Sequence, residues 1–189
     1  TTAVFSVAGT YVLALSATDG ALTTTSTTTI TVNPASTGQT TLTFTPTADS
    51  YVASGTPTTN FGSAVDLHAK NASGSIKNVF YMFTVAGAAG KTVTSAKLRL
   101  YVDDPSVTGG SIFSTASTWT ETGLTWNTQP APSGAALSTL GAVALGTTVE
   151  FTVTPVITGN GTYSFVITSP NADTVYYASK ESTHPPQLV

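Results

Sequence analysis

The chain has 189 residues, of which 6 are Lys or Arg and 9 are Asp or Glu, so its formal net charge at pH 7 is −3. This length suffices for one well-cored domain and a smaller piece, and the weak negative charge excludes the basic surface of a nucleic-acid-binding protein. Apolar residues make up 40% of the chain, which excludes a disordered protein, and no apolar run is long enough to predict a membrane span.

Threonine takes the place of charged residues. The sequence has 40 Thr and no Cys, and only 8% of its residues are charged, against roughly 25% in an average soluble domain. A disulfide-stapled scaffold is therefore excluded. A hydroxyl-rich surface of this kind favours a protein exported by a bacterial-type cell, so we expect an extracellular or cell-surface location.

The first predicted elements are two strands joined by a tight turn. The segment "GTYVLALSATDG" (residues 9–20) has the alternation of a strand, and "TTTSTTTITVNP" (residues 23–34) is rich in β-branched residues. Asp19-Gly20 is a turn signal between them. Residues 35–40 predict a short polar linker. Two strands cannot bury an apolar face by themselves, so we expect residues 1–34 to be part of a larger sheet.

Residues 3–34 resemble the C-terminal half of a PKD-like or related immunoglobulin-like repeat, which ends in a pattern of the form F…GTY…L…ATDG…T…TV. The resemblance implies that the front half of that sandwich comes from upstream residues or from another chain. In the second case these strands would add to a neighbour's sheet, and the protein would self-associate.

Residues 41–189 show many short strand patterns separated by Gly, Pro and Asn, and no helical periodicity. The segments are "TLTFTP", "DSYVAS", "VDLHAK", "NVFYMFTV", "AKLRLYV", "GSIFST", "TVEFTVT", "GTYSFVITS" and "TVYYASKE". Short strands at this spacing predict a sandwich or jelly roll. The expected fold class is therefore all-β: a jelly-roll-like antiparallel β-sandwich over residues 41–189, preceded by a partial immunoglobulin-like fragment.

Two of these strands place polar and basic side chains on one side. The outward residues predicted by alternation are Lys97, Arg99 and Tyr101 in residues 96–102, and His68 and Lys70 in residues 65–70. If both strands lie in one sheet, these residues form one surface. A guanidinium can clamp a carboxylate, an ammonium adds a point charge, and a tyrosine ring stacks on a sugar. The alternative is an ordinary solvated face whose cations offset nearby aspartates.

Both tryptophans of the chain, Trp119 and Trp126, flank the short segment "ETGLT". One interpretation is that both indoles pack over one end of the sandwich, with their N–H groups bonded to backbone carbonyls. The other is that one indole is exposed as a platform for a sugar.

The segment "TVYYASKES" (residues 174–182) carries the last candidates. Alternation sends Tyr176 and Lys180 outward and Glu181 inward. An inward carboxylate needs a partner, for which Arg99, a backbone donor or a Ca²⁺ ion shared with Asp49 are the candidates. The two histidines stand alone in the sequence, so no zinc site is predicted.

Five blocks of the same region resemble DNRLRE-type domains, which are related to the carbohydrate-binding module family that recognises alginate, a polyuronate. The blocks are "ADSYVASGTPTTNFGSAVDLHAKN", "VFYMFTVAG", "SAKLRLYV", "TWTETGLTWNTQPAP" and "YYASKESTHPPQLV". The resemblance implies a module that binds a polysaccharide, uronate-rich polymers included. As its contacts we expect the outward residues named above, with Trp119, Trp126, Tyr176 and Lys180.

The chain also departs from that family. Where a typical member has a strand like "YLKFDLS", this chain has "FYMFTVA", so Met82 and Thr84 replace a charged pair. His68 stands where a longer basic residue is expected. A neutral polymer is therefore an alternative ligand.

The sequence favours a protein that is not an enzyme, because two isolated histidines offer no base beside a nucleophile. A glycosidase pair of Glu121 and Glu150 is the alternative. We expect a non-catalytic carbohydrate-binding module of a secreted or cell-surface protein. The alternative function is a structural repeat of an extracellular filament, stalk or adhesin, whose N-terminal strands complete a neighbouring sandwich.

Overall fold

A computed structural model describes residues 2–34 and 38–189 of the chain. The chain forms two compact units, Thr1–Thr40 and Thr41–Val189. Apart from one 3-10 turn, η1 (Thr154–Val156), the regular elements of the described residues are antiparallel strands, so the predicted all-β class is confirmed. Part of the predicted linker, residues 35–37, lies outside the described residues. None of the described segments is a helix with the length and hydropathy to span a bilayer.

The first unit is a long hairpin of β1 (Gly9–Thr18) and β2 (Thr23–Val32), paired in unbroken antiparallel register. In the turn, the Asp19 carboxylate accepts hydrogen bonds from the backbone N–H groups of Ala21 and Leu22 at 3.0 and 2.8 Å, and Gly20 has a positive φ of 94°. None of residues 2–34 is buried. The predicted hairpin is present, and it has no core of its own.

The second unit contains ten strands linked by pairing. In chain order they are β3 (Ala48–Ala53), β4 (Asp66–Ala72), β5 (Ser75–Val85), β6 (Lys97–Asp104), β7 (Gly110–Thr115), β8 (Pro132–Leu140), β9 (Thr148–Thr152), β10 (Gly161–Thr168), β11 (Val175–Ala178) and β12 (Gln187–Leu188). They pair in the order β12-β6-β11-β4-β5-β10-β7-β8, with β3 beside β5 and β9 beside β6.

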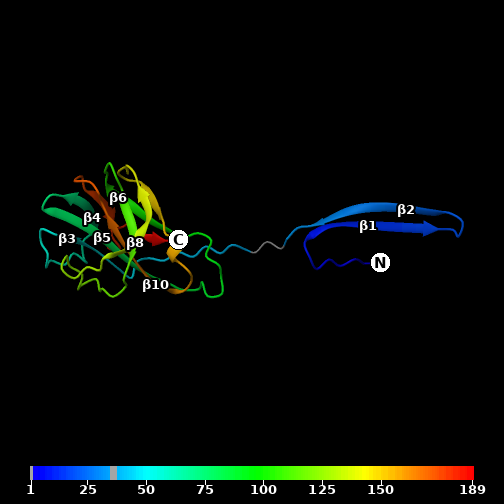
Figure 1. Ribbon diagram of the computed structural model, residues 1–189, viewed down its shortest axis with the longest axis horizontal. Coiled ribbons are helices and arrows are strands. Elements are labelled where there is room, and N and C mark those ends of the chain that lie inside the picture. The colour runs from blue at the N-terminus through cyan, green and yellow to red at the C-terminus, as the bar shows by residue number, and fades with distance from the viewer. Residues whose placement is uncertain (1, 35–37) are drawn as a thin grey trace. The chain divides into compact units, whose positions relative to one another are not determined.

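This run of strands folds over at the turn between β4 and β5. The two strands pair only over residues 70–72 and 75–77. Beyond that point β5 continues between β3 and β10, and β4 continues beside β11. Two layers result, with β3, β5, β10, β7 and β8 in one and β4, β11, β6, β9 and β12 in the other (Figure 1). The predicted β-sandwich is confirmed.

The main core lies between the layers and follows strand alternation. On β6, Leu98, Leu100 and Val102 are fully buried, while the residues between them are half-buried. On β5, Tyr81 and Phe83 point into the same core. The alternating apolar positions of the sequence therefore mark the inner face of each layer, as period-two geometry requires.

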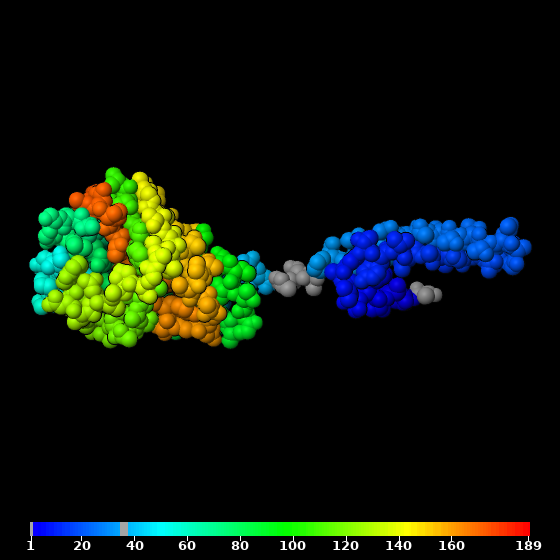
Figure 2. Space-filling view, in the orientation of Figure 1, coloured from blue at the N-terminus to red at the C-terminus, as the bar shows by residue number. Residues whose placement is uncertain are grey.

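A second, smaller core covers the outer face of the β3/β5/β10 layer. Phe80, Val52 and Val166 of that face are fully buried beneath Trp119 and Leu124 of the segment 116–131. In Figure 2 the yellow-green atoms of this segment spread over the surface of the unit. Strand β5 is thus buried on both faces, which explains its continuous apolar run "VFYMF".

Candidate functional site

The outer face of the β4/β11/β6 layer carries the residues that the sequence predicted to share a surface. Strands β4 and β6 do lie in one layer, but β11 runs between them. Tyr176 of β11 lies opposite His68 of β4 on one side and opposite Asp104 of β6 on the other. The predicted residues consequently fall into two groups. Lys97, Arg99 and Tyr101 lie on β6, and His68 and Lys70 lie on β4 beside Tyr176 of β11.

The β6 group is held by an acidic neighbour. Glu150 of β9 lies directly opposite Arg99 in the sheet. Its carboxylate accepts hydrogen bonds from Lys97 Nζ at 2.7 Å and Arg99 Nε at 2.8 Å. These hydrogen bonds lower the pKa of Glu150. The three side chains are about one-third to two-fifths exposed, so the pairs add little stability, but they orient the guanidinium.

A shallow depression of about 270 Å³ opens beside this ion pair. Its floor and rim come from β6, β9 and the segment after β11, and the lining residues are Arg99, Tyr101, Thr148, Thr183, His184, Pro185 and Gln187. The rings of Tyr101 and His184 stack at 4.1 Å between centroids with an interplanar angle of 12°. The depression thus combines one guanidinium, a pair of stacked rings, hydroxyls and an amide.

The β4 group is an aromatic stack. His68 lies between Tyr51 and Tyr176, with centroids 4.5 and 3.9 Å away, and Phe61 stacks on Tyr51 at 4.2 Å. The Lys77 ammonium donates to His68 Nδ1 at 2.9 Å. Burial and the Lys77 charge together lower the pKa of His68 to about 4. At neutral pH this histidine therefore carries no positive charge, and both of its faces are covered by rings.

The tryptophans are placed differently from either interpretation of the sequence. Trp119 packs over the outer face of the β3/β5/β10 layer, edge-on to Phe80 at 5.9 Å, and not over an end of the sandwich. Its side chain is buried at 8% exposure, and its indole N–H has no hydrogen-bond partner. The expected bond to a backbone carbonyl is thus absent for Trp119. Trp126 is half-buried at the edge of the same cluster.

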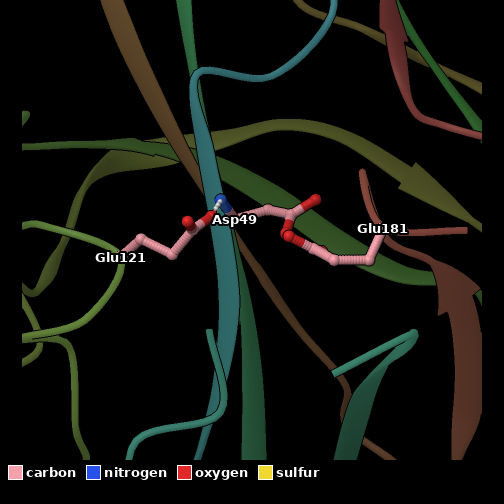
Figure 3. Close-up of side chains that lie close together, drawn as sticks. All are labelled: Asp49, Glu121 and Glu181. Carbon is pink, nitrogen blue, oxygen red and sulfur yellow. Dashed lines mark hydrogen bonds between the residues drawn. The ribbon is translucent and has the colours of Figure 1, made fainter. Parts of the chain in front are cut away.

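Three carboxylates gather around β3. They belong to Asp49 of β3, Glu121 of the segment 116–131 and Glu181 after β11 (Figure 3). Asp49 is fully buried, and burial, with the charges of Glu181 and Glu121 adding to it, raises the pKa of its carboxyl to about 7. Such a raised pKa means that burial and the neighbouring carboxylates disfavour the ionised form of Asp49.

One expectation about this region was wrong. Glu181 does not point inward but is exposed, because strand β11 ends at Ala178 and the alternation stops there. Of the three candidate partners for its carboxylate, Arg99 is paired with Glu150. Instead, the side chain of Lys180 turns to Glu181 and Glu121, at 2.5 and 3.2 Å. Glu181 does, however, lie close to Asp49, as the sequence predicted.

His184 and Gln187 are site residues that sequence reasoning missed. Both reach the depression because β12 pairs with β6, with Gln187 opposite Arg99. A two-residue strand leaves no periodic pattern, so only the pairing in space reveals it. The sequence therefore contained no local signal for this side of the site.

The acidic candidates for catalysis are engaged elsewhere. Glu121 accepts a hydrogen bond from the backbone N–H of Asp49 and pairs with Lys180, whereas Glu150 pairs with Lys97 and Arg99. The fold and the site therefore define an all-β, sandwich-type module with an open depression of polar and aromatic side chains on one face.

Sequence comparison identifies the family within that class. The chain belongs to carbohydrate-binding module family 96, whose model matches residues 40–189. The expectation of a carbohydrate-binding module is therefore confirmed. A search of curated proteins finds no match to the sequence. The relation to DNRLRE-type domains, the preference for alginate and the PKD-like origin of the hairpin stay predictions.

Proposed function

We propose that residues 41–189 bind an extended polysaccharide, without cleaving it, at the depression on the outer face of β6. The observation that carries this proposal is that Arg99 and Tyr101 line an open depression in a chain of a carbohydrate-binding family. Extended polymers suit an open depression on a sheet, because their neighbouring sugar units continue across the surface on both sides.

The chemistry of the depression suits one or two sugar units. The bond from Arg99 Nε to Glu150 holds the guanidinium, and leaves its terminal N–H groups to donate to ring or hydroxyl oxygens. The stacked pair of Tyr101 and His184 offers an apolar surface for the C–H face of a sugar. Thr148 and Gln187 add polar groups at the rim.

The charge of this face favours a neutral or sparsely charged polymer over a dense polyanion. Lys97 and Arg99 share the single negative charge of Glu150, and Asp103 lies on the same strand. His68, which would add a cation in a basic groove, is neutral at pH 7. We therefore expect binding to depend only weakly on salt concentration, since strong salt dependence requires many ionic contacts.

Affinity electrophoresis tests the proposal with alginate, polygalacturonate and a neutral β-glucan in separate gels. The wild-type chain should be retarded by at least one polymer, and Arg99→Ala and Tyr101→Ala should each lose most of the retardation, about tenfold in affinity. Lys91→Ala is the matched control, because Lys91 is an exposed cation outside the depression. Equal migration of all four proteins in every gel would contradict the proposal, as would release of reducing ends from the retained polymer.

The location follows from the ligand. Extended polysaccharides of the kind proposed here occur outside the cell or on its surface, and we expect a module that binds them to act there. The absence of Cys and the hydroxyl-rich composition agree with such an exported protein, of bacterial type.

The hairpin supports a second candidate function, assembly into a fibre or stalk. The hairpin is long, with 10 residues in each of β1 and β2. Even so, its apolar side chains Val12, Leu15 and Leu22 are about two-thirds or more exposed. An exposed apolar hairpin of this length is suited to completing the sandwich of a neighbouring molecule. Sedimentation should then show a concentration-dependent oligomer for residues 1–189 and a monomer for Leu15→Asp. A monomer in both cases at high concentration would exclude assembly through this hairpin.

A further inference from the structure

The cluster of Asp49, Glu121 and Glu181, which we call the acidic triad, joins three segments that are far apart in the sequence. One carboxylate oxygen of each residue lies within 4.8 Å of the others. In Figure 3 the Asp49 side chain extends toward Glu181, while Glu121 approaches β3 from the other side. The triad therefore connects β3, the tryptophan-bearing segment 116–131 and the segment after β11.

The acidic triad has more negative charge than its neighbours neutralise. Lys180 is the cation that pairs with it among the described residues, at 3.2 Å from Glu121 Oε1 and 2.5 Å from Glu181 Oε1. When all three carboxyl groups are ionised, three carboxylates and one ammonium leave an excess of two negative charges. A divalent cation has the charge that balances this excess.

A second, independent observation is an oxygen with no partner. Asp49 is fully buried, and its Oδ2 accepts a hydrogen bond from the backbone N–H of Lys180 at 2.7 Å. Its Oδ1 has none, and neither has the buried hydroxyl of Tyr81, the residue directly opposite Asp49 in the strand pair. Buried polar atoms in proteins almost always have a partner, so a missing ligand is indicated here.

We infer that the acidic triad binds a calcium ion, which takes the free Oδ1 of Asp49 and displaces the Lys180 ammonium from Glu121 and Glu181. Ca²⁺ accepts six to eight oxygen ligands in flexible geometry, whereas Mg²⁺ demands a near-ideal octahedron and keeps its waters. Three carboxylates from separate segments, with water completing the shell, suit the less demanding ion. The ion would fasten the segment 116–131 to β3 and to the C-terminal segment, independently of any glycan.

Calorimetric titration of the EDTA-treated, dialysed full chain with CaCl₂, and thermal unfolding with CaCl₂, MgCl₂ or EDTA, test this inference. Saturating Ca²⁺ should raise the Tm of the wild type by about 5 °C or more, and Mg²⁺ should raise it by much less. Glu181→Gln and Asp49→Asn should abolish both the heat of binding and the Tm shift. Asp173→Asn, which changes an exposed carboxylate elsewhere, should behave as the wild type.

Two features keep the test decisive. Glu181 is exposed, so Glu181→Gln leaves the core intact and a lost response cannot be attributed to misfolding. Lys180→Met removes the competing ammonium and should increase the affinity for Ca²⁺ about tenfold or more. A wild-type chain that shows neither heat nor a Tm shift at millimolar Ca²⁺ would overturn the inference, even if Lys180→Met bound the ion. A full response in Glu181→Gln would overturn it too.

Discussion

His68 acts as an aromatic ring in the packing of the sandwich and not as a surface cation. It is covered by Tyr51 on one face and Tyr176 on the other, and its Nδ1 accepts a hydrogen bond from Lys77. That hydrogen bond requires an unprotonated Nδ1, and the ammonium repels a second positive charge. Both effects, together with burial, stabilise the neutral ring in the folded chain.

His68 should consequently make the sandwich less stable in mild acid, whereas Asp49, whose pKa is raised to about 7, acts in the opposite direction over the same pH range. The pKa of His68 is about 4 in the folded chain, against the ordinary histidine value of 6.5. Between these values the imidazole of the unfolded chain binds a proton that the folded chain does not bind, so the contribution of His68 to the free energy of unfolding falls as the pH is lowered through this window. After allowance for solvent at the edge of the ring, the loss should be about 1–2 kcal/mol.

Urea unfolding at about pH 7 and about pH 4.5 measures this loss. His68→Phe keeps a ring in the stack and removes the titrating group, so on acidification its free energy of unfolding should fall less, or rise more, than that of the wild type. All other titrating groups, Asp49 included, are common to both proteins. The same change in both proteins would show that His68 does not contribute.

At the scale of elements, the segment 116–131 functions as a structural cover. It has no regular strand or helix, yet Trp119 and Leu124 bury the outer face of β3, β5 and β10. Asn60 fastens it by donating from Nδ2 to the carbonyl oxygens of Glu121 and Leu124. Gly62 is required there, because a Cβ would lie 2.5 Å from the Glu121 carbonyl oxygen. The paired tryptophans of the sequence are therefore explained mainly by packing.

Trp119→Ala should lower the free energy of unfolding by about 3–5 kcal/mol, the range for a large aromatic residue removed from a core. Trp126→Ala should cost about half as much, because Trp126 is half-buried. Urea denaturation measures both. In Trp126→Phe, the one remaining tryptophan should resist quenching by acrylamide, since Trp119 is buried. The proposed covering role of segment 116–131 would be contradicted if both alanine variants lost a similar free energy of unfolding, or if acrylamide readily quenched Trp119.

Strands with a strong period were predictable from sequence, and short or featureless ones were not. Alternation located β5 and β6 and gave the inner face of β6 correctly. It missed β8, whose small residues "PSGAALSTL" are mostly exposed on an edge strand, and β12, which has two residues. The segment "TLTFTP" forms only an isolated bridge from Phe44 to Leu188. Pairing in space, more than local preference, decides such elements.

At the scale of the whole molecule, the sandwich of residues 41–189 can account for carbohydrate binding without the N-terminal hairpin. The family model covers residues 40–189, which coincide closely with the unit Thr41–Val189. The predicted residues Arg99 and Tyr101 line the depression, whereas its other wall could not be anticipated, since it depends on β12 returning to β6. Likewise, the ion pair of Glu150 with Arg99 depends on the pairing of β9 with β6, which no sequence motif records.

Chemical-shift mapping can show whether a glycan binds at the depression beside Arg99. A ¹⁵N-labelled chain is titrated with a short oligosaccharide of whichever polymer retards it most in the gels. The shifted amide signals should belong to Arg99, Tyr101, His184 and Gln187, and the sugar should be recovered uncleaved. Shifts confined to another surface, or an oligosaccharide shortened during the titration, would contradict it.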